Sequence, residues 1–481
     1  MSQDPKCHDF QLGAKKALDD ERLQTLLGRT LENGFQKKRL QGMSRLPEYE
    51  QLRDQARDLK DHVLDHLDMY LARFEAEVTK AGGQVHWARD AAEARDIILD
   101  ICLQANAKTV SKGKSMIAEE IGLNDHLVAN AIAPIETDLG EYIIQLRDEP
   151  PSHIIAPAFH ISKEQVAETF KDSHTHLDPD RDLSEPATLL NEARGELRDK
   201  FLRADVGITG ANILVAETGT AMIVTNEGNG DLTQDLPPVH IALTSIEKVV
   251  PTLEDATLIL RLLARTATGQ EQSVYNTFFT GAKRPDDIDG PEEYHVVLLD
   301  NGRSELLGSE FRDILRCIRC GACINHCPVY GVTSGHAYGW VYPGPMGSVL
   351  TPHFVGIEEA HLLPGASTFC GRCEEVCPVR IPIPKSLRYW RAEAFESKSQ
   401  PLNERAGLSL WAWFATRPKL YQLLAGAGVA VLAKAGGAKG HLKRFPFLSG
   451  WTNHRDLPAP EGKTFQALYK KSQKEKRRVS P

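Results

Sequence analysis

The 481-residue chain lacks several features that would mark a membrane protein or a nucleotide-dependent enzyme. No stretch approaches the roughly 18 uninterrupted apolar residues of a membrane-spanning helix, and the amino-terminal segment has no apolar run typical of a secretory signal. No G-x-G-x-x-G follows an expected strand, which leaves a Rossmann site for NAD or FAD without support. Gly113-Lys114-Ser115 is similar to the end of a phosphate-binding P-loop, but Lys108 stands where the first glycine belongs.

The net charge and the cysteine pattern limit the classes of partner and the cellular compartments that fit this chain. The net charge of −8 argues against nucleic acid as the main partner, and we expect a soluble cytoplasmic protein. Clustered cysteines in that compartment are metal ligands more often than disulfides. Cys7 and Cys102 have no ligand spacing, and the apolar neighbours of Cys102 indicate a small buried side chain.

The apolar pattern predicts four segments. Residues 1–48 form a charged arm and an irregular lead-in, and residues 49–303 form one α/β domain. Strands that alternate with helices in this domain predict a mainly parallel sheet covered on both faces. Residues 304–395 form a small cofactor domain, and residues 396–481 form a helical, basic tail.

Within the α/β domain we expect one long helix over 49–80 and a buried strand over 153–158. The other expected strands cover residues 84–88, 109–111, 213–216, 221–225, 240–245 and 295–299. The other expected helices cover residues 91–105, 116–121 and 253–267, with a helical insertion at about 162–204.

Seven cysteines form two motifs, C-x2-C-x2-C-x3-C and C-x2-C-x3-C, each followed by proline. In two-cluster ferredoxins the cysteine before proline binds the other 4Fe-4S cluster. Carried onto this chain, the rule assigns to cluster one Cys317, Cys320, Cys323 and Cys377. It assigns to cluster two Cys327, Cys370 and Cys373. A pair of zinc sites is the alternative, but zinc favours two separated C-x2-C pairs.

Cluster two is one cysteine short, because Ser367 stands where a full second motif would have its first cysteine. Three possibilities stay open: an oxygen ligand such as Ser367 closes the cube, the fourth iron is open, or the cluster is a 3Fe-4S cluster. An open iron could bind the carboxylate and hydroxyl of a substrate. We favour a ligand that tunes the potential, or a labile iron, because cluster potentials respond to ligand type and exposure.

These motifs, with several further stretches, resemble the iron–sulfur B subunit of the bacterial three-subunit L-lactate utilization complex. The most specific stretches are Lys114-Ser115-Met116, Glu136-Thr137-Asp138-Leu139-Gly140-Glu141, Val206-Gly207-Ile208-Thr209-Gly210-Ala211-Asn212, Ala216-Glu217-Thr218-Gly219-Thr220, Thr225-Asn226-Glu227-Gly228-Asn229, Asp300-Asn301-Gly302-Arg303 and Gly335-His336-Ala337-Tyr338-Gly339-Trp340. The resemblance covers nearly the whole chain, and the seven-cysteine pattern looks like that of the family.

The resemblance implies a lactate-utilization domain akin to the sugar-isomerase and CoA-transferase α/β fold, followed by a two-cluster ferredoxin-like module. It implies oxidation of L-lactate to pyruvate with two partner subunits, a cysteine-rich protein and a second lactate-utilization-domain protein. Electrons would then pass singly towards a respiratory acceptor. The alternative is that this chain itself binds and oxidises lactate, or another 2-hydroxy acid such as glycolate, at an open cluster iron or in the α/β domain. Whether the chain is itself an enzyme is therefore left open.

Two glycine-rich segments, 207–220 and 226–230, allow close backbone approach to a ligand. They could form a cradle for lactate, phosphate or a nucleotide, or they could be tight turns. The polar residues of this cradle are Asn212, Glu217, Thr218, Asn226, Glu227 and Asn229. Glu217 and Lys248 are candidates for a base and an electrophile, although charged residues are mostly exposed or paired.

Two aromatic segments remain. The loop 335–347 separates the cysteine motifs, and we expect it to cap the clusters or to receive a partner. The stretch 411–423 and the basic run 470–478 could lie at the inner membrane surface as a peripheral contact. We favour instead a helix that packs on a partner subunit.

Overall fold

The computed structural model describes residues 4–443 and 455–479, without the side chains of 476–479. The chain forms two compact units, Met1–Ser399 and Gln400–Pro481. The predicted basic residues Lys476, Arg477 and Arg478 lie outside the described side chains.

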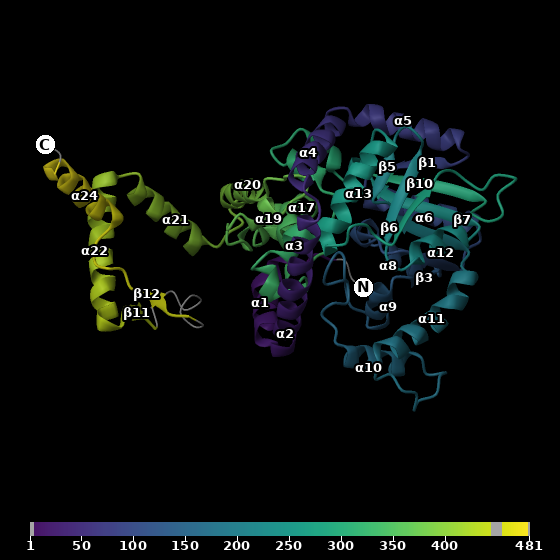
Figure 1. Ribbon diagram of the computed structural model, residues 1–481, viewed down its shortest axis with the longest axis horizontal. Coiled ribbons are helices and arrows are strands. Elements are labelled where there is room, and N and C mark those ends of the chain that lie inside the picture. Colours follow the sequence, from purple (N-terminus) through teal and green to yellow (C-terminus); the bar gives the residue numbers. More distant parts are fainter. Residues whose placement is uncertain (1–3, 444–454, 480–481) are drawn as a thin grey trace. The chain divides into compact units, whose positions relative to one another are not determined.

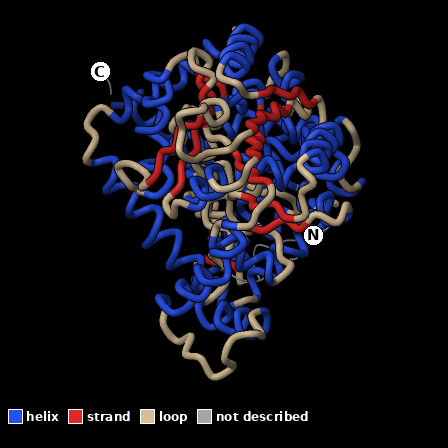
Figure 2. Tube along the Cα trace, turned by 90° about the vertical axis from the view of Figure 1, so that its right-hand side faces the viewer, coloured by secondary structure: helices blue, strands red, loops and turns tan. Residues whose placement is uncertain are grey.

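The first unit contains a six-stranded sheet in the order β1-β10-β7-β4-β2-β3, and every pair of neighbours is parallel (Figure 1). Its strands are β1 Gln84–Ala88, β2 Thr109–Lys112, β3 Ala133–Glu136, β4 Val206–Gly210, β7 Val239–Ser245 and β10 Glu293–Leu299. The predicted parallel sheet is confirmed. Figure 2 shows the strands enclosed by helices.

Both faces of this sheet are buried, as alternation along the strands requires. Val297 faces a cluster formed with the helices α6 Ala91–Gln104, α7 Met116–Glu120 and α8 Leu123–Ala129. Val296 faces the opposite cluster, which includes Phe74 and Val78 of α5 Leu67–Lys80. The sheet is therefore a rigid base whose strand ends can hold functional residues.

A second, four-stranded sheet was not expected. Its order is β8-β5-β6-β9, with antiparallel and parallel pairs. Its strands are β5 Ile213–Val215, β6 Thr220–Thr225, β8 Val249–Val250 and β9 Tyr275–Phe279. The glycine-rich segment 207–220 begins within strand β4 of the main sheet. A Cβ on Gly207 would stand 1.8 Å from the carbonyl oxygen of Thr233 in α12 Asn229–Asp235. Glycine at this position thus permits packing between strand and helix.

The arm predicted as irregular is helical, so that expectation was wrong. It contains α1 Phe10–Asp19, α2 Glu21–Thr30, the π-helix Leu31–Gln36 and α3 Lys37–Ser44. Leu27 and Leu31 are buried in the same apolar cluster as the cysteine segment. Tertiary packing against that segment, which lies about 300 residues later, supplies stability that the local charged sequence does not reveal.

Two further local expectations were wrong. The helix expected over 49–80 is divided into α4 Tyr49–Asp65 and α5, because His66 leaves helical geometry with ψ of 32°. The segment 153–158 forms turns, since Nδ1 of His153 accepts hydrogen bonds from the backbone N–H groups of Ile155 and Ala156. A local bond to the backbone thus competes with strand pairing.

The first unit contains further α-helices. In the α/β region they are α9 Leu139–Leu146, α10 Lys163–Ser173, α11 Pro186–Leu202, α13 Leu253–Thr268 and α14 Arg303–Leu307. In the cysteine region they are α15 Ala322–Asn325, α16 Tyr330–Thr333, α17 Gly344–Val355, α18 Ile357–Ala360, α19 Arg372–Glu375 and α20 Ile383–Glu396.

The second unit is helical, as expected for the tail. It contains α21 Leu402–Ala415, α22 Pro418–Gly436, β11 His441–Leu442, β12 Leu457–Pro458 and α24 Phe465–Val479. The 22-residue stretch Pro418–Lys439 is long and apolar enough to cross a membrane by length and composition, and little of it is buried. The search for an uninterrupted apolar run did not find it, because Lys419 and Lys434 lie within it.

His153 connects the α/β region to the cysteine region and predicts an acid-sensitive contact. Its Nε2 lies 2.8 Å from Oδ1 of Asn325, and burial lowers its pKa from 6.5 to about 4. Between these values the unfolded chain binds a proton that the native protein excludes, so stability falls as pH falls from 6.5 to 4, by about 3 kcal/mol. Denaturant titrations should show this slope, and His153→Gln should flatten it; an unchanged slope would contradict the assignment.

Candidate functional site

The two cysteine motifs fold as copies of one turn, offset by 50 residues. In each copy a left-handed residue precedes the second cysteine position: Arg319 with φ of 58° and Phe369 with φ of 53°. A left-handed glycine, Gly321 or Gly371, then begins a short helix, α15 or α19. The correspondence places Ser367 at the position of Cys317, and the Oγ of Ser367 accepts a hydrogen bond from Phe369 N.

The folded chain brings the seven thiols into two neighbourhoods. Cys317, Cys320, Cys323 and Cys377 line one small cavity. Electrostatic coupling joins Cys327 to Cys370 and Cys373. These neighbourhoods contain the thiols that were predicted for each cluster, and the ligand sets themselves stay a prediction. Burial and nearby thiols raise the pKa of Cys320 and Cys373 to about 12, and binding of a metal would require their deprotonation.

Among the described residues, no three thiols are grouped as closely as a site for a single zinc ion requires. Among described residues, the only group of three or more His, Cys, Asp or Glu side chains with ligand atoms within 4.8 Å is Glu119, Glu136 and Glu141. A tetrahedral zinc site with bonds of about 2.3 Å needs sulfurs about 3.8 Å apart. The thiols therefore stand wider apart than one zinc ion can hold. Lys112 lies beside this cluster of three glutamates, and its ammonium is 2.8 Å from the Glu136 carboxylate.

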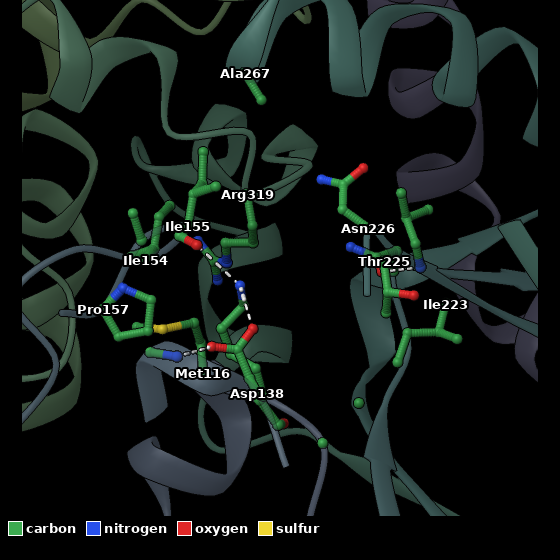
Figure 3. A pocket seen from close by; sticks show the side chains of 18 of the residues that line it. Met116, Asp138, Ile154, Ile155, Pro157, Ile223, Thr225, Asn226, Ala267 and Arg319 are labelled. Carbon is green, nitrogen blue, oxygen red and sulfur yellow. Dashed lines mark hydrogen bonds and ion pairs between the residues drawn. The ribbon is translucent and has the colours of Figure 1, made fainter. Parts of the chain in front are cut away.

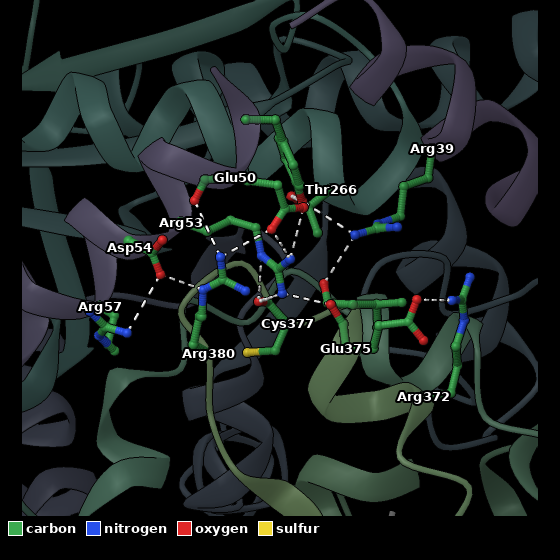
Figure 4. Close-up of polar contacts among 12 residues, drawn as sticks. Arg39, Glu50, Arg53, Asp54, Arg57, Thr266, Arg372, Glu375, Cys377 and Arg380 are labelled. Carbon is green, nitrogen blue, oxygen red and sulfur yellow. Dashed lines mark hydrogen bonds and ion pairs between the residues drawn. The ribbon is translucent and has the colours of Figure 1, made fainter. Parts of the chain in front are cut away.

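Buried arginines hold the last cysteine segment in place (Figure 4). Arg53 on α4 donates to the carbonyl oxygen of Cys377 at 2.7 and 3.0 Å and to that of Glu375 at 2.6 Å. Arg39 donates to the carbonyl oxygen of Val376 at 3.2 Å. These cations satisfy buried carbonyls and place positive charge near the thiols of Cys320 and Cys377, which sequence patterns did not reveal.

The two thiol groups differ in exposure. Cys370 is exposed, whereas Cys320 and Cys377 are buried. Cys320 and its neighbour Arg319 also line a pocket of about 480 Å³ in the α/β region (Figure 3). One thiol of the first set therefore borders the pocket, and one thiol of the second set reaches the surface.

The pocket lies where several strands of the main sheet end, the usual place for a ligand in an open α/β sheet. Lys114 follows β2, Asp138 follows β3, and Asn212 follows β4. Asp138 caps α9 by accepting hydrogen bonds from the backbone N–H groups of Gly140 and Glu141. Lys114 lies 3.6 Å from the Asp138 carboxylate and donates to the carbonyl oxygen of Ile155 at 2.9 Å.

The pocket contains four of the six predicted cradle residues, Asn212, Asn226, Glu227 and Asn229. Glu217 and Thr218 do not line it. The Glu217 carboxylate accepts a hydrogen bond from Leu253 N, and Thr218 donates to the hydroxyl of Thr220. The structure therefore does not bring Glu217 and Lys248 together in the pocket as a base and an electrophile.

Sequence reasoning missed Asp138 and Arg319 as pocket residues and did not use Lys114 as one. Burial and the neighbouring Asp138 raise the pKa of Glu227. Burial and nearby Arg319 lower the pKa of Lys248 to about 8. Carboxylates and cations thus line the same pocket, and the cation Arg319 is adjacent in sequence to Cys320.

The aromatic loop 335–347 is well packed. Tyr342 is buried, donates a hydrogen bond to Glu120 at 2.6 Å, and lies under the guanidinium of Arg319 at 4.9 Å. His336 Nε2 donates to the carbonyl oxygen of Pro150 at 2.9 Å. The loop therefore positions Arg319 from behind, while its role as a cap or docking surface stays a prediction.

Three family models match consecutive parts of the chain: the LUD domain over residues 71–299, the 4Fe-4S dicluster domain over 313–381, and the Lactate utilisation protein B C-terminal model over 394–474. A solved DUF162-family protein from Deinococcus radiodurans aligns with 48% of this chain and 98% of its own, at 14% identity and a TM-score of 0.28.

Curated relatives match almost end to end. Lactate utilization protein B of Lysinibacillus sphaericus is 41% identical over 95% of each chain, and that of Bacillus licheniformis is 39% identical over 97% of each. A protein of Escherichia coli K12 named "Uncharacterized electron transport protein YkgF" is 40% identical over 98% of each. The chain belongs to the lactate utilization protein B family.

Proposed function

We propose that this protein is the electron-transfer subunit of a complex that oxidises L-lactate to pyruvate. The observation that carries the proposal is the placement of the thiols: one set borders the pocket at Cys320, and the second set reaches the surface at Cys370. The two bound clusters would each exchange one electron at a time. The chain would supply the ligands and place cations around cluster one.

The finer parts of the proposal extend the family assignment. Cluster one would be held by Cys317, Cys320, Cys323 and Cys377, and cluster two by Cys327, Cys370 and Cys373. The names of the relatives support a lactate-utilization system, in which we place a cysteine-rich subunit, a second lactate-utilization-domain subunit and a respiratory acceptor as partners. We further propose a cytoplasmic location, with any membrane contact peripheral, and a kinship of the α/β domain to the sugar-isomerase and CoA-transferase fold.

The test is anaerobic reconstitution of the full chain, followed by EPR of the oxidised and dithionite-reduced protein. We expect two reducible clusters, each taking one electron, that are then reoxidised by a quinone analogue. A protein that binds no iron, or whose clusters cannot pass electrons to an external acceptor, would refute the proposal.

The same spectra address the missing ligand of cluster two. A three-iron signal in the oxidised sample would indicate a labile iron at the Ser367 position. Ser367→Cys, which restores the cysteine of the first motif, should then suppress that signal and leave cluster one unchanged. If the oxidised wild-type protein shows no three-iron signal, the labile-iron alternative is wrong.

A second candidate function is that this chain itself receives the 2-hydroxy acid. The contact between the pocket and Cys320 favours the α/β domain over an open cluster iron as the place where such a substrate would bind.

A further inference from the structure

The wall of the pocket that includes Cys320 also includes Lys248, which is 7% exposed. Its electrostatic neighbours include Glu247 and Cys317, but within the described part of the chain no residue accepts a hydrogen bond from its ammonium or forms a close ion pair with it. A buried ammonium is costly unless it is paired. Its position therefore indicates that an anion completes the site.

Arg319, on the same wall, is also incompletely paired. Its Nε is buried without a hydrogen-bond partner among the described residues, and its Nη1 has only the weak acceptor Sδ of Met346 at 3.3 Å. Its Nη2 lies 3.5 Å from Glu247, a carboxylate that also lies 3.1 Å from Arg303. Arg319 has a left-handed backbone, which is unfavourable for a residue other than glycine, and its guanidinium lies over the ring of Tyr342 with Cys317 as an electrostatic neighbour.

The local charge balance leaves room for a negative ligand. Two carboxylates, Glu120 and Glu247, face the buried cations Lys60, Lys248, Arg303 and Arg319. Part of the excess positive charge would offset the charge of cluster one, since Cys317 is an electrostatic neighbour of Lys60, Lys248 and Arg319. Lys60 contacts the backbone of Glu247 and does not line the pocket. The need to offset the charge of cluster one therefore suffices to explain why Lys60 is buried there. It does not explain why Lys248 lines the pocket.

The same pocket is also lined by carboxylates. Asp138 and Glu227 are close enough to couple electrostatically, and Lys114, which also lines the pocket, attracts both of them. Such carboxylates accept a hydrogen bond from a hydroxyl group. A ligand that reaches both the cations and the carboxylates thus needs an anionic group and a hydroxyl.

We propose that this pocket binds a small 2-hydroxy carboxylate, with its carboxylate against Lys248 and Arg319 and its hydroxyl towards Asp138 and Glu227. The choice of a 2-hydroxy acid rests in part on the proposed function in lactate oxidation. The site places the ligand beside cluster one, so the negative charge of the ligand must lower the reduction potential of that cluster.

The test uses the full chain with reconstituted clusters, L-lactate as the probe, and propionate as the matched ligand without a hydroxyl. Calorimetry should show saturable binding of L-lactate and weaker binding of propionate. Lys248→Met should weaken L-lactate binding at least about tenfold, because a charged hydrogen bond is lost. This variant is expected to fold, since it replaces an unpaired buried charge with an apolar chain of similar length.

Lys60→Met is the matched control, because Lys60 is a buried cation near Cys317 that lies outside the pocket. It should leave the affinity for L-lactate unchanged and lower the potential of cluster one in an EPR-monitored redox titration. L-lactate should lower that potential in the wild type and not in Lys248→Met.

No saturable binding by the wild type, or equal affinity in Lys248→Met and Lys60→Met, would overturn the inference. Clusters that form and pass electrons without any binding of L-lactate would leave the proposed function intact and reject this site alone. A chain without clusters would reject the proposed function, while calorimetry would still decide whether the pocket binds the acid.

Discussion

Cys320→Ser is expected to remove cluster one and to lower the iron content from about eight atoms to about four per chain. Cys320 is buried and lines the small cavity shared with Cys317, Cys323 and Cys377. Loss of one thiolate from an enclosed set should therefore prevent assembly rather than merely shift the potential. Iron and sulfide analysis, with EPR of the reduced protein, would measure the effect.

Cys102→Ser is the matched control. Cys102 is equally buried, but it lies in the apolar cluster between α6 and the main sheet, far from the other thiols in sequence and in contacts. Burial raises the pKa of its thiol to about 12, as expected for an inert side chain. Both clusters should persist in this variant. Equal iron loss in the two variants would show that Cys320 acts through folding and is not a ligand.

The cysteine motifs and four strands of the main sheet, β1, β2, β7 and β10, could be predicted because their signals are local, whereas β3 and β4 were missed. Strands buried on both faces appear as short apolar runs, and β1, β7 and β10 begin or end within two residues of the expected bounds. The cysteines within each motif have a spacing that one turn can satisfy, and this spacing made the two motifs recognisable as cluster-binding sequences. The helical tail was likewise visible in composition alone.

The rest depends on contacts between distant parts of the chain. The helices α1 and α2 are stabilised by the cysteine segment, and the local sequence does not record that partner. Lys114, Asp138 and Arg319 meet in one pocket although they follow different strands and motifs. Lys114 and Asp138 did lie in the stretches most typical of the family, so that signal could have identified them. Nothing local distinguishes Arg319 from a surface arginine.

Arg303→Met should destabilise the protein by about 3–5 kcal/mol, the usual effect of breaking a buried ion pair from one side. Arg303 is 1% exposed and donates two hydrogen bonds to Glu120, at 2.7 and 2.9 Å, while its Nε lies 3.1 Å from Glu247. The variant would remove the main cationic partner of two buried carboxylates, Glu120 and Glu247. Tyr342 binds the same Glu120, so the loss should loosen the contact between the α/β region and the cysteine loop.

Arg89→Met is the control, because Arg89 pairs with Glu93 in solvent and is 87% exposed at its side chain. Exposed pairs contribute about 0–1 kcal/mol. Urea unfolding followed by circular dichroism should separate the two variants clearly. Similar small shifts in both would mean that water or neighbouring groups satisfy Glu120 and Glu247 without Arg303.

The pH dependence of this effect identifies its cause. Burial opposes ionisation of Glu247, yet Arg303 and Arg319 lower its pKa to about 2. In the wild type this carboxylate therefore stabilises the fold above its unfolded pKa of about 4.5, and the contribution is lost as pH falls towards 2. Without Arg303 burial dominates, the carboxylates take up protons at higher pH, and their protonation relieves the penalty. The destabilisation by Arg303→Met should thus be largest near neutral pH and shrink on acidification, whereas a simple packing defect would cost the same at every pH.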